Sequence, residues 1–245
     1  MLVLEKGHYR ARIAETPDDV AAAQTLRHDC FGLNHAHGLD QDAFDDLCEH
    51  MLVEDAETSD LICCYRIMHL NSGDDITRSY SAQYYNLSAL QSYQGKLVEM
   101  GRFCIDPACN DPDVLRIAWG AMTQYVDHND VSLLFGCASF HGIDQDVYRD
   151  SFAMLRDKHL APKRWLPRVK APNVFRFAQR LTGAPDMKQA MRRMPPLLKT
   201  YLMMANINSG FAWAPPRGSF MIPSMSPFFF ISVAVSLSAS AAFSL

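Results

Sequence analysis

Apolar and polar positions follow one another along residues 9–160 in a pattern that predicts alternating strands and helices. Short apolar runs, bounded by polar or turn-forming residues, predict strands at 9–15, 50–57, 61–70, 97–105 and 131–140. Longer segments whose apolar residues recur every three or four positions predict helices at 16–31, 110–128 and 144–160. The order of these elements predicts an α/β fold, with helices on a mixed central sheet.

Two of the predicted helices begin with residues that favour a first helical turn. Thr16 and Asp111 can each cap a helix with a side-chain oxygen, and Pro17 and Pro112 follow at the first helical position. The strand 61–70 is apolar on both faces, which is typical of a strand inside a sheet. We therefore expect this strand to lie between two others.

Charged residues interrupt two of the apolar strands. Glu99 and Arg102 lie in the run LVEMGRFCIDP, and Arg66 lies in the run LICCYRIMHL. A buried charge is costly unless it is paired or hydrogen-bonded. A regular strand would point Glu99 and Arg102 to opposite faces, but a bulge at Gly101 would turn both toward one cleft. Such a bulge also leaves backbone groups unpaired, and an amide-bearing arm can fill that gap by strand addition.

Other charged and aromatic residues fit the same cleft. Arg27 and Phe31 are four positions apart in the helix 16–31, so they share a face. Asp42 and Asp45 lie in the acidic segment that follows. Carboxylates and guanidinium groups nearly balance, so they can pair within one site. The sequence therefore predicts a site that contains Arg27, Phe31, Asp42, Asp45, Arg66, Glu99 and Arg102.

Composition narrows the class of protein. The 245-residue chain is 49% hydrophobic, which suits one globular domain with or without an appendage. Its seven cysteines form no CxxC pair, so we expect reduced thiols in a cytoplasmic protein. The start of the chain has no secretory signal. His35 and His37 form an HxH pair, but no third ligand is evident, so no metal site is expected.

The net charge of −4 hides an uneven distribution. Residues 1–154 hold 10 Lys or Arg against 25 Asp or Glu, whereas residues 155–200 hold 12 against 2. This basic block predicts an anionic partner or surface, unless it only neutralises the acidic part of the chain. No nucleic acid partner is expected. The candidate docking residues are Lys163, Arg164, Arg168, Lys170, Arg192 and Arg193.

Six motifs occur in an order that resembles one family of enzymes. They are RHDCF, DQDAFDDLCEHMLVED, CCYRIM, SYSAQYYNLSAL, LVEMGRFCIDP and LLFGCASFHG, and the resemblance covers residues 8–205. The chain resembles the ornithine-acyl carrier protein N-acyltransferases of the GNAT superfamily (Gcn5-related N-acetyltransferases). The acyl-homoserine lactone synthases share the seven site residues, but they usually have a Trp soon after the Phe, which is missing after Phe31.

The resemblance implies a GNAT-like fold and a specific reaction. A 3-hydroxyacyl group moves from acyl carrier protein to the α-amine of L-ornithine, which gives lyso-ornithine lipid. The donor is a phosphopantetheine thioester, and no bound cofactor is expected. Glu99 is the candidate general base, with a pKa raised by burial, unless it is only an ion-pair partner of Arg102. Asp42 and Asp45 are expected to hold the ammonium end of ornithine or to pair with Arg66 and Arg102.

Backbone groups of the strand 97–105 and two side chains near the end of the strand 131–140 are also candidates for contacts with the donor. Backbone N–H groups at Gly101, Phe103 and Cys104 are expected to bind the thioester oxyanion and the pantetheine arm. Ser139 and His141 suggest a nucleophile pair, but direct transfer requires none. We interpret them as part of a wall along the acyl chain or the pantetheine arm.

The segment DPACNDPDVL, residues 106–115, bears on the donor. Acetyl-CoA-using members usually have a Gly-rich loop here that holds a pyrophosphate at the helix N-terminus. This segment has no Gly and three acids, so we expect a carrier-protein donor that the basic block docks. The alternative partner of the block is the anionic inner face of the cytoplasmic membrane, where the enzyme would be peripheral.

Residues 206–245 depart from the family pattern, so the predicted domain is 8–205 with an atypical tail. The last charge is Arg217, and residues 228–245 form an uncharged run of 18, at the lower limit for a spanning helix. A change of reading frame, a tail on or in the membrane, and an ordered C-terminal element are three interpretations. If the final strand of the family is missing, a carrier-binding protein without activity is a further alternative.

Overall fold

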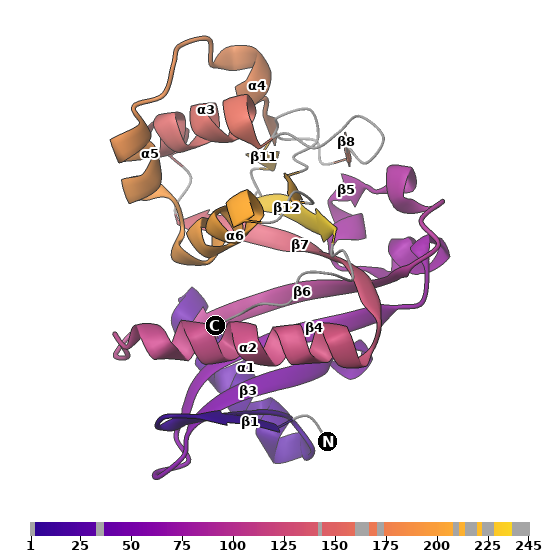
Figure 1. Cartoon of the computed structure of the whole chain (residues 1–245), viewed down its shortest axis with the longest axis vertical. Helices are drawn as coiled ribbons and strands as arrows, with labels where there is room; N and C mark the ends of the chain where they lie inside the picture. Colours follow the sequence, from indigo (N-terminus) through magenta and orange to yellow (C-terminus); the bar gives the residue numbers. More distant parts are fainter. Residues whose placement is uncertain are drawn as a thin grey trace. The chain divides into compact units, whose positions relative to one another are not determined.

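Two segments distant in sequence, residues 1–69 and 98–131, form one unit of the structure, and residues 70–97 and 132–242 form another. The computed structural model describes residues 3–32, 37–141, 144–159, 167–170, 174–207, 211–213, 220–221 and 228–236. Each unit has its own helices, strands and buried side chains (Figure 1).

The first unit holds the candidate site. Its elements are β1 (Val3–Lys6), β2 (Tyr9–Ile13), α1 (Pro17–Phe31), η1 (Asp45–Leu47), β3 (Glu49–Asp55), β4 (Leu61–Leu70), β6 (Lys96–Ile105) and α2 (Pro112–His128). The strands lie in the order β1-β2-β3-β4-β6, and neighbours from β1 to β4 run antiparallel. The prediction that the strand 61–70 lies between two others is confirmed, since β4 lies between β3 and β6.

Both long helices begin where the sequence predicts. The Thr16 hydroxyl accepts a hydrogen bond from the Asp19 N–H, and the Asp19 side chain accepts one from the Thr16 N–H. The Asp111 side chain accepts from the Asp113 N–H at 2.9 Å, and Pro112 is the first helical residue of α2. These side chains satisfy N–H groups that have no partner within the helix. Local sequence therefore fixes the start of α1 and of α2.

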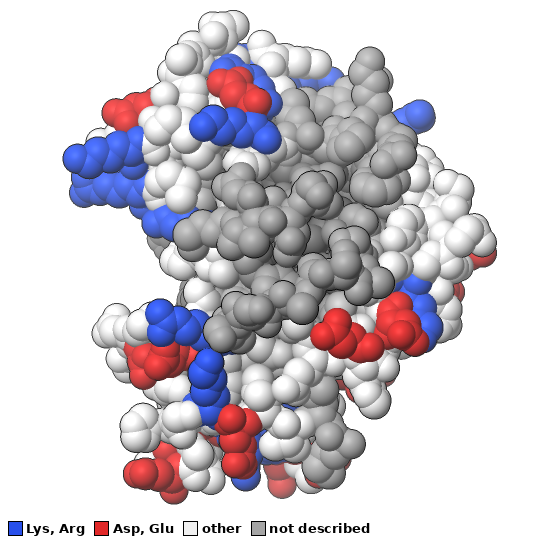
Figure 2. All heavy atoms as spheres, in the orientation of Figure 1, with Lys and Arg blue, Asp and Glu red and all other residues white. Residues whose placement is uncertain are grey.

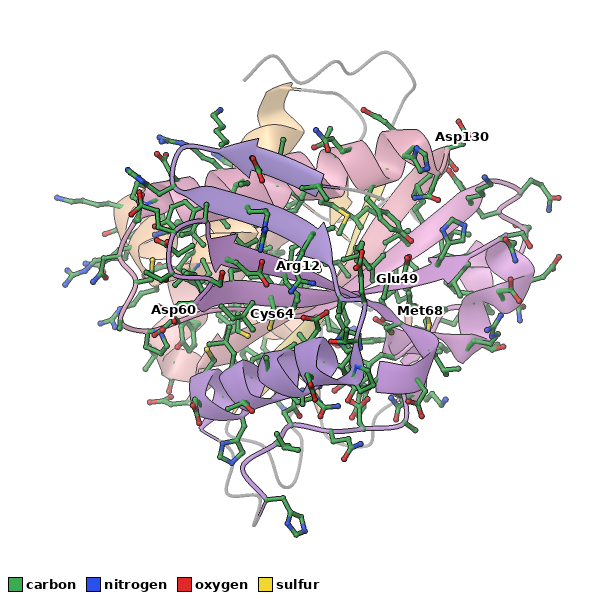
Figure 3. All side chains as sticks on the ribbon, turned by 90° about the horizontal axis from the view of Figure 1, so that it is seen from below. Arg12, Glu49, Asp60, Cys64, Met68 and Asp130 are labelled. Atoms are coloured by element: carbon green, nitrogen blue, oxygen red, sulfur yellow. The ribbon has the colours of Figure 1, made fainter. Side chains whose placement is uncertain are left out.

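Helices α1 and α2 cover opposite faces of this sheet. Cys64 of β4 packs against Ala23 of α1, with its Sγ 3.6 Å from the Ala23 carbonyl oxygen. The next residue, Tyr65, points to the other face, where its hydroxyl donates to the Ala118 carbonyl of α2 at 2.8 Å. Figure 3 shows Cys64 between the sheet and α1. Because successive side chains of a strand point to opposite faces, one face of β4 packs against α1 and the other against α2.

The second unit contains the remaining helices and strands. They are η2 (Gly73–Arg78), η3 (Ser81–Gln83), β5 (Tyr85–Asn86), η4 (Ser88–Leu90), β7 (Val131–His141), η5 (Gln145–Tyr148), α3 (Arg149–Lys158), β8 (Arg168–Val169), β9 (Val174–Phe175), α4 (Phe177–Arg180), α5 (Met187–Arg193), α6 (Pro196–Ile207), β10 (Phe211–Trp213), β11 (Phe220–Met221) and β12 (Phe228–Ser236). The helix predicted at 144–160 begins with the tighter turn η5 and becomes α-helical at Arg149.

Aromatic residues form the core of the second unit around α3. Phe152 of α3 and Phe140 of β7 are fully buried, with ring centroids 5.0 Å apart in an edge-to-face arrangement. Phe177 of α4 lies on Phe152 at 5.7 Å. The Ser151 hydroxyl donates to the Ala190 carbonyl at 2.8 Å, which ties α3 to α5.

The described part of the tail continues the strands of the second unit. β12 pairs antiparallel with β7 from Phe228–His141 to Ser236–Leu133, and β10 and β11 both pair with β12 (Figure 1). Among the described residues, no helix combines the length and the apolar character needed to cross a bilayer. The three interpretations of the tail stay predictions.

A cluster of charges joins β2, β3 and the start of α1. Arg12 contacts Asp19 (Nη2–Oδ1, 2.7 Å) and Glu54 (Nη2–Oε1, 2.6 Å). The hydrogen bond from Arg12 holds the pKa of Asp19 well below its usual value. Burial acts to raise the pKa of Glu54, but hydrogen bonds from Arg12 and Arg10 outweigh it and lower that pKa. Both carboxylates therefore stabilise the fold in their ionised form.

We predict that Arg12→Met lowers the free energy of unfolding at neutral pH by about 1–3 kcal/mol, because two carboxylates lose a charged hydrogen-bond donor. Both carboxyl pKa values are lower in the folded state, so this contribution is present at neutral pH. It should begin to fall as the pH drops below the ordinary carboxyl value, about 4, and be lost as the pH passes the lower folded-state pKa values. Urea unfolding of parent and variant at several pH values measures it.

The matched control is Arg116→Met. Arg116 pairs with Asp113, and both side chains are more exposed than buried, at 63% and 61%. Arg116→Met should lower the free energy of unfolding by less than about 0.5 kcal/mol. Equal losses in the two variants, or an Arg12 effect that persists in acid, would contradict the prediction.

Candidate active site

The segment from Asp40 to Asp45 lies against α1 and forms ion pairs with Arg27. The Nε of Arg27 donates to Asp40 Oδ2 at 3.0 Å, and its Nη2 donates to Asp45 Oδ1 at 2.9 Å. The same Nη2 also donates to the Asp40 carbonyl oxygen. Gln24, one turn earlier in α1, donates to Asp45 Oδ2 at 3.0 Å. Arg27 is 1% exposed, so α1 buries a charge and the loop supplies its countercharges.

Arg66 of β4 extends this network to Asp42. Its Nη1 donates to Asp42 Oδ1 at 2.5 Å and to Asp45 Oδ1 at 3.0 Å, and its Nη2 donates to Asp42 Oδ2 at 3.2 Å. The planar guanidinium group allows this two-point contact with one carboxylate. The Phe44 ring covers Arg66, with its centroid 5.9 Å from Cζ.

Arg102 of β6 closes the network. Its Nη2 donates to Asp42 Oδ2 at 3.2 Å, and its Nε lies 3.2 Å from Asp40 Oδ2. Its Cζ lies 5.7 Å from the ring centroid of Phe31 in α1. Arg102 therefore contacts α1 and the acidic loop at once.

Three arginines and three aspartates thus form one charge-balanced network. Its members are Arg27, Arg66, Arg102, Asp40, Asp42 and Asp45. The side chains of Arg102 and Asp42 are 20% and 26% exposed, and the other four are at most 5% exposed. The Arg102–Asp42 end is therefore the part of the network that solvent reaches.

The sequence-predicted residues on α1, the acidic loop and β4 meet in this network, together with Arg102. The pairing of Asp42 and Asp45 with arginines, one of the two roles expected for them, is present, while the ornithine-binding role stays a prediction. Sequence reasoning missed Asp40. The signal was the spacing of three acids, at 40, 42 and 45, in one loop.

Burial and pairing oppose each other in setting the pKa values of the network. Burial acts to raise the pKa of Asp42, but the hydrogen bond and charge of Arg66 outweigh it and lower that pKa. Burial likewise acts on Asp45, and the charge of Arg27 prevails and lowers its pKa. Burial lowers the pKa of His50, whose Nε2 lies 3.1 Å from the Asp45 carbonyl oxygen. His50 is therefore neutral at neutral pH, and Asp42 and Asp45 are ionised.

The backbone of β6 is irregular one residue after the expected place. Arg102 has a φ of 53°, in the left-handed region that non-glycine residues rarely adopt. The irregularity predicted at Gly101 thus falls on the next residue. A left-handed residue costs about 1–2 kcal/mol. After it, Phe103 stacks on Tyr65 at 5.4 Å, and the Cys104 Sγ lies 3.5 Å from the Cys64 Sγ.

Glu99 lies three residues before this kink and is 4% exposed. Burial raises the pKa of the Cys48 thiol to about 12, Arg66 acts against this shift, and Glu99 adds to it. The charges of Glu99 and of the arginine–aspartate network therefore both act on the pKa of Cys48. The burial of Glu99 is consistent with either role expected for it, and the general-base role stays a prediction.

The basic block divides into two places on the second unit. Arg192 and Arg193 are exposed in the last turn of α5, where Figure 2 shows Lys and Arg side chains gathered on the surface. Arg168 and Lys170 are exposed at β8, which lies away from α5 in Figure 1. Lys163 and Arg164, and the side chains of Ser139 and His141, lie outside the described residues.

Two described cations of the block contact groups of their own unit. Arg156 pairs with Asp157, its neighbour in the block. Lys170 donates to the Ala82 carbonyl oxygen at 2.8 Å. Within the described ranges, Arg192 and Arg193 form no ion pair with an acid. Their charge is therefore available to an external anion.

The N-terminus of α2 is occupied by its own side chains. Asp111 caps the Asp113 N–H, Pro112 has no N–H, and Asp113 adds a second carboxylate to the first turn. The Asp106 side chain accepts from the Ala108 N–H at 2.8 Å in the preceding turn. An anionic diphosphate would meet carboxylates here rather than free N–H groups.

We predict that Arg66→Met lowers the free energy of unfolding by about 3–5 kcal/mol, because it removes one of the two arginine partners from each of two partly or fully buried carboxylates. Arg66→Lys should recover part of this loss, since an ammonium group keeps the charge but not the two-point contact. Thermal and urea unfolding measure both variants. Arg78→Met is the control, because Arg78 is 55% exposed and pairs with Asp75 at the surface. A loss at Arg66 no larger than at Arg78 would contradict the buried-network interpretation.

Known proteins resemble this chain in sequence. The family model described as an acetyltransferase (GNAT) domain matches residues 24–120, which include most of α1, the acidic loop, β3, β4 and β6. An L-ornithine N(alpha)-acyltransferase of Rhodobacter capsulatus is 30% identical over 210 residues, which cover 80% of each chain. A Brucella abortus protein of the same name is 27% identical over 214 residues, 81% of this chain and 76% of the relative.

A solved structure supports the same fold. The N-acyl amino acid synthase FeeM from uncultured soil microbes aligns with a TM-score of 0.50 at 14% identity, over 93% of this chain and 90% of that one. An identity this low indicates the fold alone. The Rhodobacter relative is similar enough, over enough of both chains, to settle the family. This chain belongs to the L-ornithine N(alpha)-acyltransferases, a family of acyltransferase enzymes with the GNAT fold.

Proposed function

We propose that this enzyme transfers a 3-hydroxyacyl group from acyl carrier protein to the α-amine of L-ornithine and so makes lyso-ornithine lipid. The observation that carries the choice of acceptor is the shared name of the relatives, which act on L-ornithine at its α nitrogen. Two observations support the chemistry: Glu99 is a buried carboxylate that acts on Cys48 together with Asp42, Asp45 and Arg66, and the accessible end of the network consists of Asp42 and Arg102.

In the proposed mechanism Glu99 accepts a proton from the α-ammonium group of ornithine, directly or through water. The neutral amine attacks the thioester carbonyl carbon, a C–N bond forms, and backbone N–H groups around residues 101–104 stabilise the oxyanion. The C–S bond then breaks, and the pantetheine sulfur leaves as a thiol with the proton that the attacking nitrogen loses. Asp42 attracts the cationic acceptor at the exposed end of the network.

The start of α2 supports the choice of donor. A coenzyme A donor carries a diphosphate, for which helix N–H groups are the usual partners. Asp111 and Asp113 occupy that position here. A carrier protein presents a single phosphate and an acidic surface, which suits the exposed cations of the second unit. Acyl carrier protein is therefore the favoured donor.

An amine panel tests the acceptor. The enzyme is incubated with 3-hydroxyacyl-carrier protein and ornithine, lysine or S-adenosylmethionine, and products are read by mass spectrometry. Acylated ornithine is the expected product. A lactone released from S-adenosylmethionine would instead indicate a signal synthase. Binding of the carrier without transfer to any amine would indicate a carrier-binding protein without activity.

We predict that Glu99→Gln keeps the fold and lowers turnover by about 10²–10⁴-fold, the usual contribution of a general base. Gln has the same shape but cannot accept the proton. Turnover is measured with saturating donor at several pH values. The control is Glu57→Gln, an exposed residue of the turn after β3, which should leave turnover unchanged. Parent-like turnover of Glu99→Gln across the pH range would rule out the base assignment.

A second prediction concerns the docking of the donor. Reversal of Arg192 and Arg193 to Glu should raise KM for acyl carrier protein, with little change in the ornithine dependence. Salt should weaken the parent's affinity, since such attraction is screened over about 8–10 Å at physiological ionic strength. Reversal of Arg168 and Lys170 tests β8 in the same way.

Lipid vesicles separate the two anionic partners. A charge-reversal variant that no longer pellets with anionic vesicles, but keeps the parent's KM for acyl carrier protein, would favour the membrane as the partner of the block. If neither measurement responds to either pair of reversals, the docking role of these cations is wrong.

A further inference from the structure

We infer that Asp40 is a positioning residue that holds Arg102, and through Arg102 the kinked segment of β6, in the geometry that acyl transfer uses. The activity part of this inference rests on the proposed function. The structural part does not, because it concerns only how Asp40 restrains the backbone beside Glu99.

Asp40 is itself fixed by α1 through three groups. Its N–H donates to the Gln24 carbonyl oxygen at 3.0 Å. Its carbonyl oxygen accepts from Arg27 Nη2, and its Oδ2 accepts from Arg27 Nε at 3.0 Å. The residue is 3% exposed. Asp40 is therefore an anchored, buried carboxylate rather than a mobile surface acid.

The same carboxylate oxygen reaches across to β6. Asp40 Oδ2 lies 3.2 Å from Arg102 Nε, so one oxygen links a helix residue and a strand residue. The other acid on Arg102 is Asp42, whose side chain is 26% exposed and which also binds Arg66. Of the two acids, Asp40 is the more deeply buried and the more tightly restrained.

Arg102 requires such a restraint because its φ of 53° is unfavourable for a residue with a side chain. The kink is held downstream by Phe103 on Tyr65 and by Cys104 beside Cys64. A Cβ at Gly101 would meet nothing within 4 Å, so there is open space beside that residue. The ion pair with Asp40 acts together with the hydrogen bond to Asp42 to restrain the Arg102 side chain, and with it the kink.

Glu99 lies three residues upstream, so a relaxed kink would reorient it. If residues 101–102 became extended, the strand alternation would shift by one, and the carboxylate would move away from its present position. The proposed oxyanion-binding N–H groups lie on the same backbone segment. Asp40 thus affects chemistry without touching the reacting atoms, and its loss should lower kcat more than it changes KM.

The test compares Asp40→Asn with Asp46→Asn. Asn keeps the shape and one acceptor oxygen but loses the charge, and Asp46 is an exposed acid of the same loop. We expect Asp40→Asn to lower kcat by about 10–100-fold, as small misplacements of reacting groups do. KM for ornithine should stay within about twofold. Asp46→Asn should match the parent.

Hydrogen exchange supplies a readout that needs no activity. Amide exchange in the peptide covering residues 98–105 should be faster by about tenfold in Asp40→Asn, because the kinked segment opens more often. The same substitution in an Arg102→Gly background should add little to exchange in this peptide. Gly accepts the left-handed conformation by itself and has no guanidinium for Asp40 to hold.

The possible outcomes distinguish the restraint of β6 by Asp40 from its effect on acyl transfer. Unchanged exchange at 98–105 in Asp40→Asn, or an equal increase in the Arg102→Gly background, would overturn the positioning role whatever the substrate is. Faster exchange with no activity on any amine in the parent would refute the proposed function and leave the restraint of β6 standing. A large rise in KM with unchanged kcat would show that Asp40 acts in binding instead.

Discussion

A buried guanidinium group must find carboxylates within hydrogen-bonding distance, and this constraint organises the first unit. Arg27 and Arg66 come from a helix and from the middle of a sheet, where neither has local partners. The loop from Asp40 to Asp45 supplies the partners for both. Because neutralisation works only when α1, the loop and β4 are all in place, the ion pairs fix the relative position of these elements.

The same pairing compensates for an unfavourable backbone. Arg102 adopts a left-handed conformation beside Gly101, and its side chain is held by two acids and by the ring of Phe31. Strain of this kind persists where surrounding contacts over-determine it, and such residues concentrate at functional sites. Here the strained residue lies three positions from a buried carboxylate, on the strand whose N–H groups the proposed reaction uses.

The second unit contributes a different kind of charge. Arg192 and Arg193 project from a short helix that packs against α3, and the described acids leave them unpaired. The three arginines and three aspartates of the network in the first unit balance one another, whereas Arg192 and Arg193 in the second are exposed cations. The paired charges help to specify the structure, and the exposed cations provide long-range attraction for an anionic partner.

The sequence by itself determined the elements whose causes are local. The starts of α1 and α2 follow from Thr16 and Asp111, because a capping side chain needs only its own first turn. The central place of β4 follows from its apolar faces, and the family follows from the order of the motifs. The charged residues were recognised as one group, since charges in apolar segments demand partners.

Only the tertiary structure decided which charge pairs with which. Asp40 was missed because an acid in a loop looks solvated until the fold brings Arg27 and Arg102 to it. The kink was expected at Gly101, whose freedom is visible in the sequence, but it lies at Arg102. The Arg102 side chain is held by residues 60 or more positions away in the sequence, so no local sequence pattern predicts that restraint. Local energies choose where elements start and end, whereas the pairing of buried charges depends on contacts that exist only after folding.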